Sequence, residues 1–408
     1  MLFAVSPAIV TGAFPAAERG RALGLNAVVV ALGTSAGPTL GGIITDHFTW
    51  RWIFYLNVPL GILGLLATLR VLHEGTPQGQ GRFDPLGALL LAVGLAALTL
   101  GLSFGQEWSW RSWRLILCLV LGVAALGALV AVERRVKDPI VDLALLRNRV
   151  FASANVSLVL NFLALFAVSF MLPFYFEQLR GFSTQESGLL LTPLPLTIAI
   201  VAPISGSLAD RVGSRWLTAG GLGLACVGLA LISALGPGSS IFDIVWRLVV
   251  TGVGQALFQS PNNSALMGSA PREAQGVAAG FLATGRVVGQ STSVALAGAV
   301  FASFGGAAAG RALAGHAHGG YLPAAQVAAL RHAFVTGYHA AFVVCAVVAA
   351  CGVLTSLVRG GEHGPPRPRR VLDKGNSARR GRPRPRNSVP NHAPGAFVYL
   401  DREKKECG

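Results

Sequence analysis

The sequence predicts an all-α membrane protein that crosses the bilayer many times. Of its 408 residues, 52% are hydrophobic and only 12% are charged, and the mean hydropathy is +0.58. Soluble globular domains have about a quarter of their residues charged. Apolar runs of about twenty residues, the helix length that crosses a hydrocarbon core, recur along the chain with short polar breaks. Water is therefore not the main solvent of this chain.

The apolar runs place the expected helices in order. Complete spans are expected over residues 22–44, 51–72, 84–105, 113–132, 150–176, 186–208, 216–235, 242–266, 277–303 and 333–357. Residues 1–13 are expected to form the end of another span. Between the last two spans we expect a Gly/Ala-rich external loop.

Lys and Arg in the loops predict the orientation, because short cytoplasmic loops retain cations. One set of alternating loops is rich in them and is placed in the cytoplasm: Arg19, Arg21, Arg70, Arg82, Arg134, Arg135, Lys137, Arg147, Arg149, Arg211, Arg215 and Arg272. The other set has fewer cations and carries tryptophans at positions 50, 52, 108, 110 and 113, which favour membrane interfaces. We expect a multi-pass protein of the inner or plasma membrane.

The net charge of +15 comes largely from the C-terminal end. Residues 359–408 contain thirteen Lys and Arg against five Asp and Glu, which leaves +8. This stretch is rich in Pro and Arg and has almost no apolar periodicity, so a disordered cytoplasmic tail is expected. Anionic lipid headgroups are the favoured partner and a polynucleotide the alternative, so no nucleic-acid function is assigned.

An internal repeat joins the two ends of the chain. Pro15, Gly20, Gly24 and Gly33 recur as Pro271, Gly276, Gly280 and Gly289 at a constant offset of 256. Doubled helical units are the way in which many transporters are built. About a hundred residues precede the second copy within its half, so we expect that about three and a half helices are missing before residue 1.

The repeat predicts the domain organisation. Residues 1–72 form the remainder of an N-terminal helical bundle, and 73–147 form an inserted two-helix segment without a counterpart in the repeat. Residues 148–358 form a C-terminal six-helix bundle, and 359–408 form the tail.

Three motifs stand out, one within a span, one at the start of a span and one in the turn after a span. The first is Gly33-x-x-x-Gly37-Pro38-x-x-Gly41-Gly42. The second is Trp50-Arg51-Trp52-Ile53-Phe54-x-x-Asn57-x-Pro59-x-Gly61. The third is Gly206-x-Leu208-Ala209-Asp210-Arg211-x-Gly213-x-Arg215.

Each motif has a physical interpretation of its own. Glycines four apart share one helix face and allow a neighbouring helix to approach closely, and Pro38 adds a bend; a gating role and an ordinary tight crossing are both open. Trp50 and Trp52 suit an interfacial anchor, while Asn57 can hydrogen-bond another helix. The third motif is a short cytoplasmic turn that either orients the chain or holds neighbouring helices together.

Together the motifs resemble those of the 14-spanner drug:proton antiporters of the major facilitator superfamily, the multidrug-resistance-B and quaternary-ammonium-resistance type of exporter. The resemblance covers about residues 1–357. It implies the major facilitator fold, with two six-helix bundles plus two inserted helices, here N-terminally truncated. It also implies that the first motif gates the cavity and that the third holds neighbouring helices in one access state.

Polar residues at membrane depth are costly and are therefore candidates for the solute pathway. The candidates are Asn155, Asn161, Gln259, Asn262 and Arg286, with Gln178, Gln255 and Asn263 as further cavity residues. Snorkelling is the alternative for Arg286, and lipid or core packing is the alternative for an aromatic stripe at Phe162, Phe166, Phe170 and Phe174.

Catalytic and metal chemistry is not indicated. Gly33-Thr34-Ser35-Ala36-Gly37 matches a nucleophile elbow in letters only, because that device needs a strand before it. His316-x-His318 lacks a third ligand, and the phosphate-binding pattern GxxxxGK[ST] does not occur. We assign no catalytic residue, no metal and no cofactor, and the protein is not expected to be an enzyme.

The expected function is proton-coupled efflux of small amphipathic or hydrophobic compounds by alternating access, with the proton gradient as energy source. Coupling requires a carboxylate at membrane depth; relatives place it in the first helix, and Glu177 is a weak substitute. The expected partners are a small-molecule substrate, the bilayer and, in a Gram-negative cell, a periplasmic adaptor. An inactive fragment, a non-transporting scaffold and a membrane-embedded enzyme remain alternatives.

Overall fold

Helices make up the regular structure of the described part of the chain. The computed structural model describes residues 6–7, 9–10, 13–14, 18–71, 84–104, 112–136, 143–271, 274–317 and 323–358. The expected tail at 359–408, Trp108, Trp110 and most of residues 1–13 lie outside the described residues.

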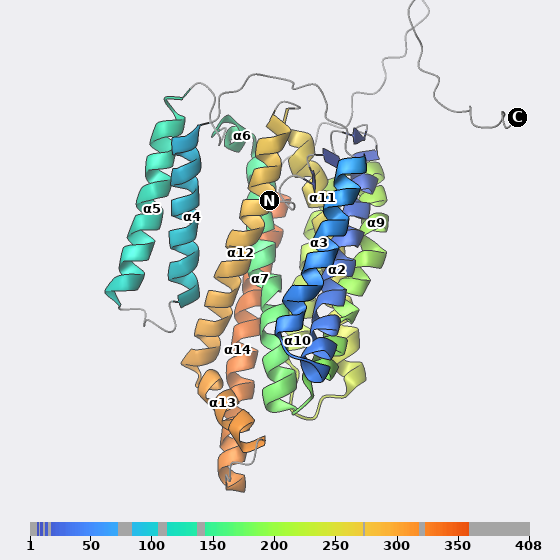
Figure 1. Ribbon diagram of the computed structural model, residues 1–408, viewed down its shortest axis with the longest axis vertical. Coiled ribbons are helices and arrows are strands. Elements are labelled where there is room, and N and C mark those ends of the chain that lie inside the picture. The colour runs from blue at the N-terminus through green and yellow to red at the C-terminus, as the bar shows by residue number, and fades with distance from the viewer. Residues whose placement is uncertain are drawn as a thin grey trace, which may run out of the picture. The chain divides into compact units, whose positions relative to one another are not determined.

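The elements follow one another along the chain as in Figure 1. They are α2 (Arg19–His47), α3 (Arg51–Val71), α4 (Pro85–Phe104), α5 (Trp113–Glu133), α6 (Leu143–Arg147), α7 (Arg149–Phe174), the π-helix η2 (Tyr175–Leu179), α8 (Thr184–Leu191), α9 (Pro193–Val212), α10 (Ser214–Ser233), α11 (Ile241–Ser269), α12 (Gln275–Ser303), α13 (Gly306–Ala317) and α14 (Ala324–Leu357). Within the described residues, eight helical stretches are long and apolar enough to cross a membrane. The expectation of a polytopic all-α fold is confirmed.

Two features depart from the predicted spans. The span predicted at 186–208 is present as the candidate span Thr184–Ala209, but it is divided into α8 and α9 because Pro193 begins the second helix and has no N–H to continue the first. The prediction of a loop after residue 303 was wrong, since the alanine-rich segment forms α13, and alanine has the highest helix propensity. The chain turns by 78° between α12 and α13. Gly305 makes this turn at φ +76°, a conformation that glycine adopts without steric cost.

Polar caps determine where several helices begin. The Asn148 side chain accepts a hydrogen bond from the Val150 N–H at 3.0 Å at the start of α7. Ser183 and Glu186 form a reciprocal capping box at the start of α8. Ser240 accepts a hydrogen bond from the Asp243 N–H at 3.1 Å at the start of α11.

The main core lies among the helices after residue 149. Helix α7 packs against α11, α12 and α14, and α10 packs against α11 and α14, as Figure 1 shows for α7, α12 and α14. Fully buried aromatic side chains fill the space between them, including Tyr175, Phe258 and Phe342. These contacts form the body against which the earlier helices pack.

Helix α2 joins this body through α8, α9 and α11. A smaller core of Ala31, Ile198, Ala202 and Ala256 lies at that junction. Gly24 allows α2 to approach α9 closely, because a Cβ atom there would lie 3.0 Å from the Pro203 Cα of α9. The junction places one face of α2 opposite α7, α11 and α12.

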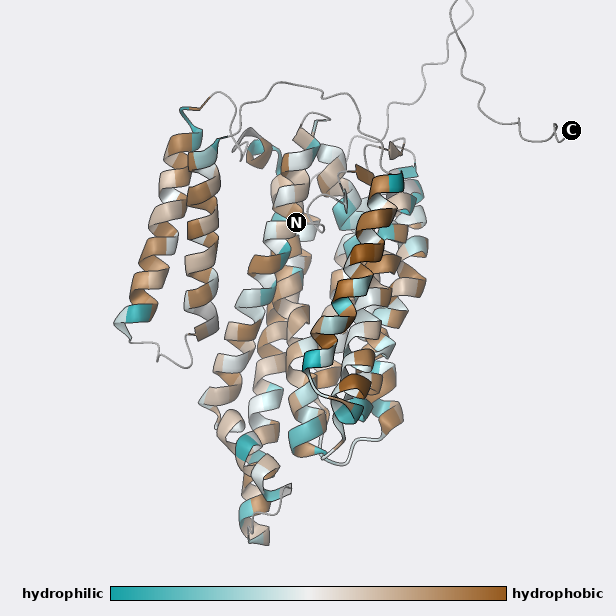
Figure 2. Ribbon diagram, in the orientation of Figure 1, coloured by the Kyte–Doolittle hydropathy of each residue, from teal (hydrophilic) through white to brown (hydrophobic). Residues whose placement is uncertain are grey.

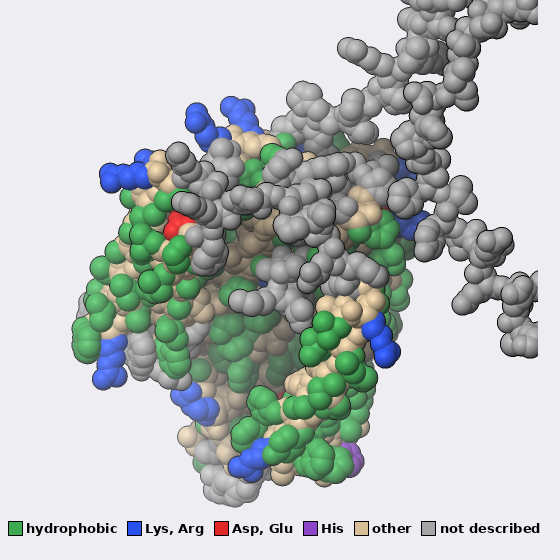
Figure 3. All heavy atoms as spheres, turned by 45° about the horizontal axis from the view of Figure 1, so that its top comes forward, with side chains coloured by type: hydrophobic (Ala, Val, Ile, Leu, Met, Phe, Trp, Pro, Cys, Tyr) green, Lys and Arg blue, Asp and Glu red, His purple; other side chains and the backbone are tan. Residues whose placement is uncertain are grey.

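Outward-facing side chains are apolar over most of the spans. Helix α3 has no buried residue, and its large hydrophobic side chains are exposed except for Ile53, which is half-buried. Figure 2 shows α3, α4 and α5 as largely hydrophobic ribbons. In Figure 3 hydrophobic side chains cover the flanks of the helices, whereas Lys and Arg gather near their ends. This distribution suits contact with lipid along the flanks and with headgroups at the ends.

The repeat is visible in helix boundaries. Helix α2 runs from 19 to 47 and α12 from 275 to 303, so both ends differ by 256 residues (275 − 19 and 303 − 47). Both helices contain 29 residues. Because both also contribute to the same cavity, equivalent positions of the two copies can be compared directly.

Candidate functional site

A cavity of about 200 Å³ lies between α2 and the C-terminal helices. One face each of α2, α7, α9, α11 and α12 contributes, together with the end of α8. The large polar side chains of the lining come from α11 and α12, whereas its aromatic side chains come from α7.

Helices α11 and α12 supply the polar wall. Gln255 and Gln259 are one turn apart on α11, and Arg286 and Gln290 are one turn apart on α12, so each pair shares a helix face. Gln259 is only 7% exposed. Within the described part of the chain, none of the three glutamine amides forms a hydrogen bond, so their donors and acceptors remain available to a bound molecule.

Phenylalanines of α7 supply the apolar wall next to Arg286. The guanidinium carbon of Arg286 lies 4.9 Å from the centroid of the Phe162 ring, within cation–π distance. Phe166 and Ile198 extend the apolar surface. Phe170 and Phe174 do not line the cavity; their ring centroids are 5.4 Å apart and they pack against the main core. The aromatic stripe expected on α7 is therefore shared between cavity and core.

The predicted pathway residues fall into two groups. Gln259 and Arg286 line the cavity. Asn262 is fully buried and donates a hydrogen bond to the Ala154 carbonyl at 3.1 Å, away from the cavity. Asn155 and Asn161 also lie outside the lining; Asn161 is fully buried, and within the described residues its amide has no hydrogen-bond partner.

Gln290 was missed by sequence reasoning, although a signal for it was present. It follows Arg286 by four residues and therefore continues the same polar helix face. Ser35 and Thr34 from α2 also line the cavity, but small hydroxyl residues are too common in apolar helices to mark a site.

The glycine motif on α2 contacts α8 through its last residue. A Cβ atom on Gly42 would lie 2.9 Å from the Thr184 carbonyl oxygen, and one on Gly188 would lie 2.6 Å from the Pro38 carbonyl oxygen. The Thr39 and Thr192 hydroxyls are 2.9 Å apart across the same contact. Among the described residues nothing lies within 4 Å of a Cβ built on Gly33, Gly37 or Gly41. The close approach to another helix occurs at Gly42 and Gly188.

The second motif begins α3 at the end of the tight α2–α3 connection. The Trp50 and Trp52 side chains are exposed, as interfacial anchors are. The Asn57 amide donates to the Ile53 carbonyl of its own helix at 3.2 Å. It does not bond another helix among the described residues.

The third motif forms the turn from α9 to α10. Gly213 has φ +94°, which permits the sharp reversal between the two helices. An Arg215 Nη2 donates to the Leu357 carbonyl oxygen at 2.6 Å, so this loop holds the end of α14. Gly206 is buried in α9 and Arg211 is exposed, whereas the Asp210 side chain lies outside the described residues.

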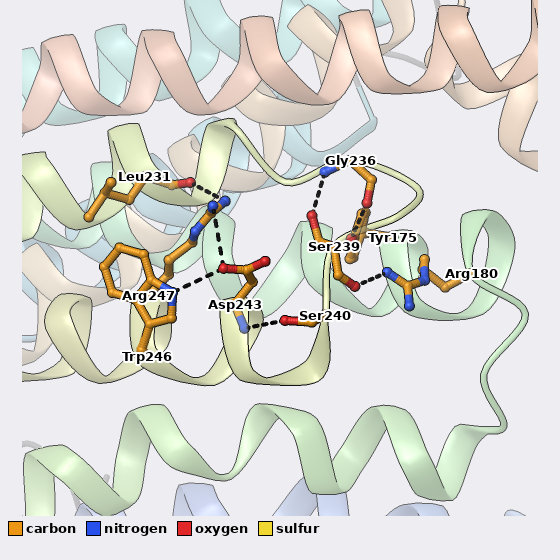
Figure 4. Close-up of polar contacts among 9 residues, drawn as sticks. All are labelled: Tyr175, Arg180, Leu231, Gly236, Ser239, Ser240, Asp243, Trp246 and Arg247. Carbon is orange, nitrogen blue, oxygen red and sulfur yellow. Dashed lines mark hydrogen bonds and ion pairs between the residues drawn. The ribbon is translucent and has the colours of Figure 1, made fainter.

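A group of polar contacts, here called the polar clamp, holds the connection between α10 and α11, at the end of α10 away from the α9–α10 turn (Figure 4). The connecting residues 234–240 are held from η2 and the residue that follows it: the Tyr175 hydroxyl donates to the Gly236 carbonyl at 2.7 Å, and Arg180 donates to the Ser239 carbonyl at 2.5 Å. The Gly236 N–H in turn donates to the Ser239 hydroxyl at 2.9 Å. Because π-turns often occur at functional positions, η2 is a candidate hinge.

Arg247 forms the second half of the clamp. Its Nη1 donates to the Leu231 carbonyl at 3.0 Å, and its Nη2 lies 4.0 Å from the Asp243 carboxylate. The guanidinium carbon is 5.5 Å from the Trp246 ring centroid, and the Trp246 indole N–H donates to Asp243 at 3.3 Å. Arg247 thus binds groups at this helix end, as a snorkelling arginine does.

Arg247→Leu is expected to destabilise the protein by about 1–3 kcal/mol, because it removes a charge-assisted hydrogen bond and leaves the Leu231 carbonyl without its donor. Thermal unfolding in detergent, followed by tryptophan fluorescence, measures the change. Arg331→Leu, at an exposed position of α14, is the matched control. Equal melting temperatures for the two variants would contradict this account of the clamp.

A family model for the Major Facilitator Superfamily matches residues 1–294. The chain belongs to the Major Facilitator Superfamily. Its superfamily relatives include the uncharacterized transporter YebQ of Escherichia coli K12, 35% identical over 74% of this chain and 66% of that protein. The riboflavin transporter RibZ of Clostridioides difficile is 34% identical over 74% of this chain and 65% of that protein.

A third superfamily relative is the multidrug resistance protein Stp of Mycobacterium tuberculosis, 33% identical over 73% of this chain and 56% of that protein. The chain thus spans between about half and two thirds of the length of these relatives. The relatives are transporters and not enzymes, so a multi-pass membrane transporter is the functional class to which this chain is related.

Proposed function

We propose that this chain is part of a secondary active transporter that exports small amphipathic or hydrophobic compounds by alternating access. The observation that carries the proposal is the cavity between α2 and its repeat-related helix α12. In transporters built from repeats, the substrate site lies where the repeats meet. Its amphipathic lining, with amides on one side and phenylalanines on the other, suits a ligand of mixed polarity.

The direction of transport rests on similarity. The relatives include Stp, the multidrug transporter protein MdtP of Bacillus subtilis and the tetracenomycin C resistance and export protein of Streptomyces glaucescens. RibZ is named for riboflavin, so the substrate of this chain is proposed only as a class. The motifs support the drug:proton antiporter branch and, with it, a location in the inner or plasma membrane.

Proton coupling is the second part of the proposal. A carboxylate that changes its protonation at membrane depth would link proton movement to the access state. No carboxylate is among the described residues that line the cavity, so the coupling group is proposed to lie elsewhere in the protein. Glu177 on η2 is the candidate in the described chain, next to the polar clamp.

The open glycine face of α2 suggests a packing partner outside the described residues. Gly289 is the repeat counterpart of Gly33, and a Cβ atom on it would lie 2.7 Å from the Phe162 Cβ of α7. We propose that Gly33 packs in the same way against a first-half helix equivalent to α7. The rival proposal, a non-transporting scaffold, predicts no solute movement even when such helices are present.

Inverted membrane vesicles test the proposed function. The chain is expressed with any coding sequence found upstream of Met1, and accumulation of a fluorescent dye is followed while an inside-acid gradient is imposed. We expect accumulation that an uncoupler abolishes. Gln255→Leu, which removes one cavity amide, should lower it severalfold, whereas Arg331→Leu outside the cavity should not. Vesicles with the extended protein that move no dye would favour the scaffold.

A further inference from the structure

The polar lining of the cavity differs between the two copies of the repeat. Arg286 and Gln290 of α12 line one side, and their counterparts 256 residues earlier, Val30 and Thr34 of α2, line the other. The helices have the same length and equivalent ends. We therefore attribute the different side chains at these equivalent positions to what the cavity binds, and not to what the helix needs in order to form.

Arg286 is not required by the fold of the repeat. Val30 serves at the equivalent position of α2, and an arginine at membrane depth costs several kcal/mol more than a valine. A cation kept at this cost on a cavity wall indicates a use for its charge. Arg286 is also the one formally charged side chain among the described residues that line the cavity.

The geometry of Arg286 suits an oxygen-bearing ligand. Its guanidinium carbon lies 4.9 Å from the Phe162 ring centroid, and a guanidinium next to a ring face keeps N–H groups around its edge. Five donors allow more than one acceptor to be bound at once, so a ligand oxygen can be added to the contacts that Arg286 already has. A carboxylate can accept two of these hydrogen bonds in parallel.

The remaining lining favours a flat aromatic body. Phe162, which is 6% exposed, and Phe166 line the cavity from α7, and Ile198 lines it from α9. Gln255 and Gln259 face the cavity from α11 without hydrogen-bond partners in the described chain. Gln259 is buried, and because a buried amide without a partner is costly, a polar substituent on a bound ring would satisfy it.

We propose that the cavity binds a flat aromatic anion, with its carboxylate or phenolate oxygen on Arg286 and its ring on Phe162 and Phe166. The proposal rests on the proposed function in one respect, that this cavity is the substrate site. It specifies the substrate class as anionic, with Arg286 as the specificity-determining residue and Gln290 as a binding residue for every probe. An aromatic cation of equal size meets the guanidinium charge at close range and is disfavoured.

Three naphthalene probes of nearly equal size test the charge preference: 2-naphthoate, neutral 2-naphthamide and 2-naphthylmethylammonium. Binding to the purified 408-residue protein in nanodiscs is measured by titration calorimetry, with empty nanodiscs as the blank for lipid partitioning. We expect naphthoate to bind roughly tenfold or more tightly than the ammonium, with the amide between them, because a charge-assisted hydrogen bond replaces a repulsion.

Variants locate the preference at Arg286. Arg286→Gln should abolish the difference between naphthoate and naphthamide, and Arg286→Lys should retain part of it, because it keeps the charge without the planar guanidinium. Gln290→Leu should lower the affinity for all three probes and leave their order of affinity unchanged. This variant tests the cavity as the binding site if Arg286→Gln does not fold. Arg331→Leu, exposed and outside the cavity, should match the wild type.

Two results would overturn the proposal. One is tighter or equal binding of the ammonium by the wild type. The other is an undiminished naphthoate preference in Arg286→Gln. Both results can be distinguished from failure of the proposed function. Transport in vesicles together with a preference for the cation would support the exporter and contradict anion binding. Binding of the anion without any transport would support anion binding and contradict the exporter.

Discussion

Gly254→Val is expected to force α10 and α11 apart and to destabilise the protein by about 3 kcal/mol or more. The two helices touch through their backbones at paired glycines. A Cβ atom on Gly254 would collide with the Ala225 amide nitrogen, and one on Gly221 would lie 2.6 Å from the Phe258 nitrogen. Backbone atoms cannot rotate away as a side chain can, so the whole interface has to open.

Gly223 of α10 provides the matched control for this prediction. It lies on the same helix as Gly221, and nothing is within 4 Å of a Cβ built on it among the described residues. Thermal unfolding in detergent should show a midpoint lower by roughly 10 °C for Gly254→Val and little change for Gly223→Val. A Gly254 variant that melts with the wild type would show that the helices do not touch in this way.

Gly188→Val is expected to reduce transport roughly tenfold by preventing α2 and α8 from meeting. A Cβ on Gly188 would lie 2.6 Å from the carbonyl oxygen of Pro38, which belongs to the motif whose proposed role is gating. In alternating access, contacts between helices of different halves form in one access state and break in the other. A change of about 1.4 kcal/mol in the free-energy difference between the two access states changes the ratio of their populations tenfold. Dye accumulation in inverted vesicles measures the effect.

Gly37→Val is the comparison on the other side of the motif. Its Cβ would meet nothing within 4 Å among the described residues, so little loss is expected from contacts that the structure describes. If this variant also lost transport, the face of Gly33, Gly37 and Gly41 would be shown to contact a helix outside the described residues, as its proposed gating role requires. Normal transport by the Gly188 variant would remove gating from the α2–α8 contact.

Most of the helices were predictable because hydrocarbon length and apolar composition limit where they can lie, although α14 begins at Ala324, nine residues before the expected span at 333–357. The spans expected at 113–132 and 242–266 appear as Trp113–Glu133 and Ile241–Ser269. The α8–α9 break and the bend before α13 were not predicted. Both depend on single residues, Pro193 and Gly305, whose effect on direction cannot be read from hydropathy.

The site was only partly predictable. Arg286 and Gln259 were found by the cost of polar groups at membrane depth, and both line the cavity. The same reasoning also selected Asn155, Asn161 and Asn262, which lie in the interior away from the lining. Polarity at depth signals that a side chain needs a partner, and it does not say whether the partner is another helix or a solute.

By itself the sequence determined that the chain is a membrane-spanning helical protein, where its spans lie, and that the segments 256 residues apart are copies. Only the tertiary structure decided which faces of α2 and α12 meet across a cavity and which glycines bring backbones into contact. The physical reason is one of range. Hydropathy and helix propensity act within a single segment, whereas a cavity wall depends on how several helices rotate about their axes when they pack.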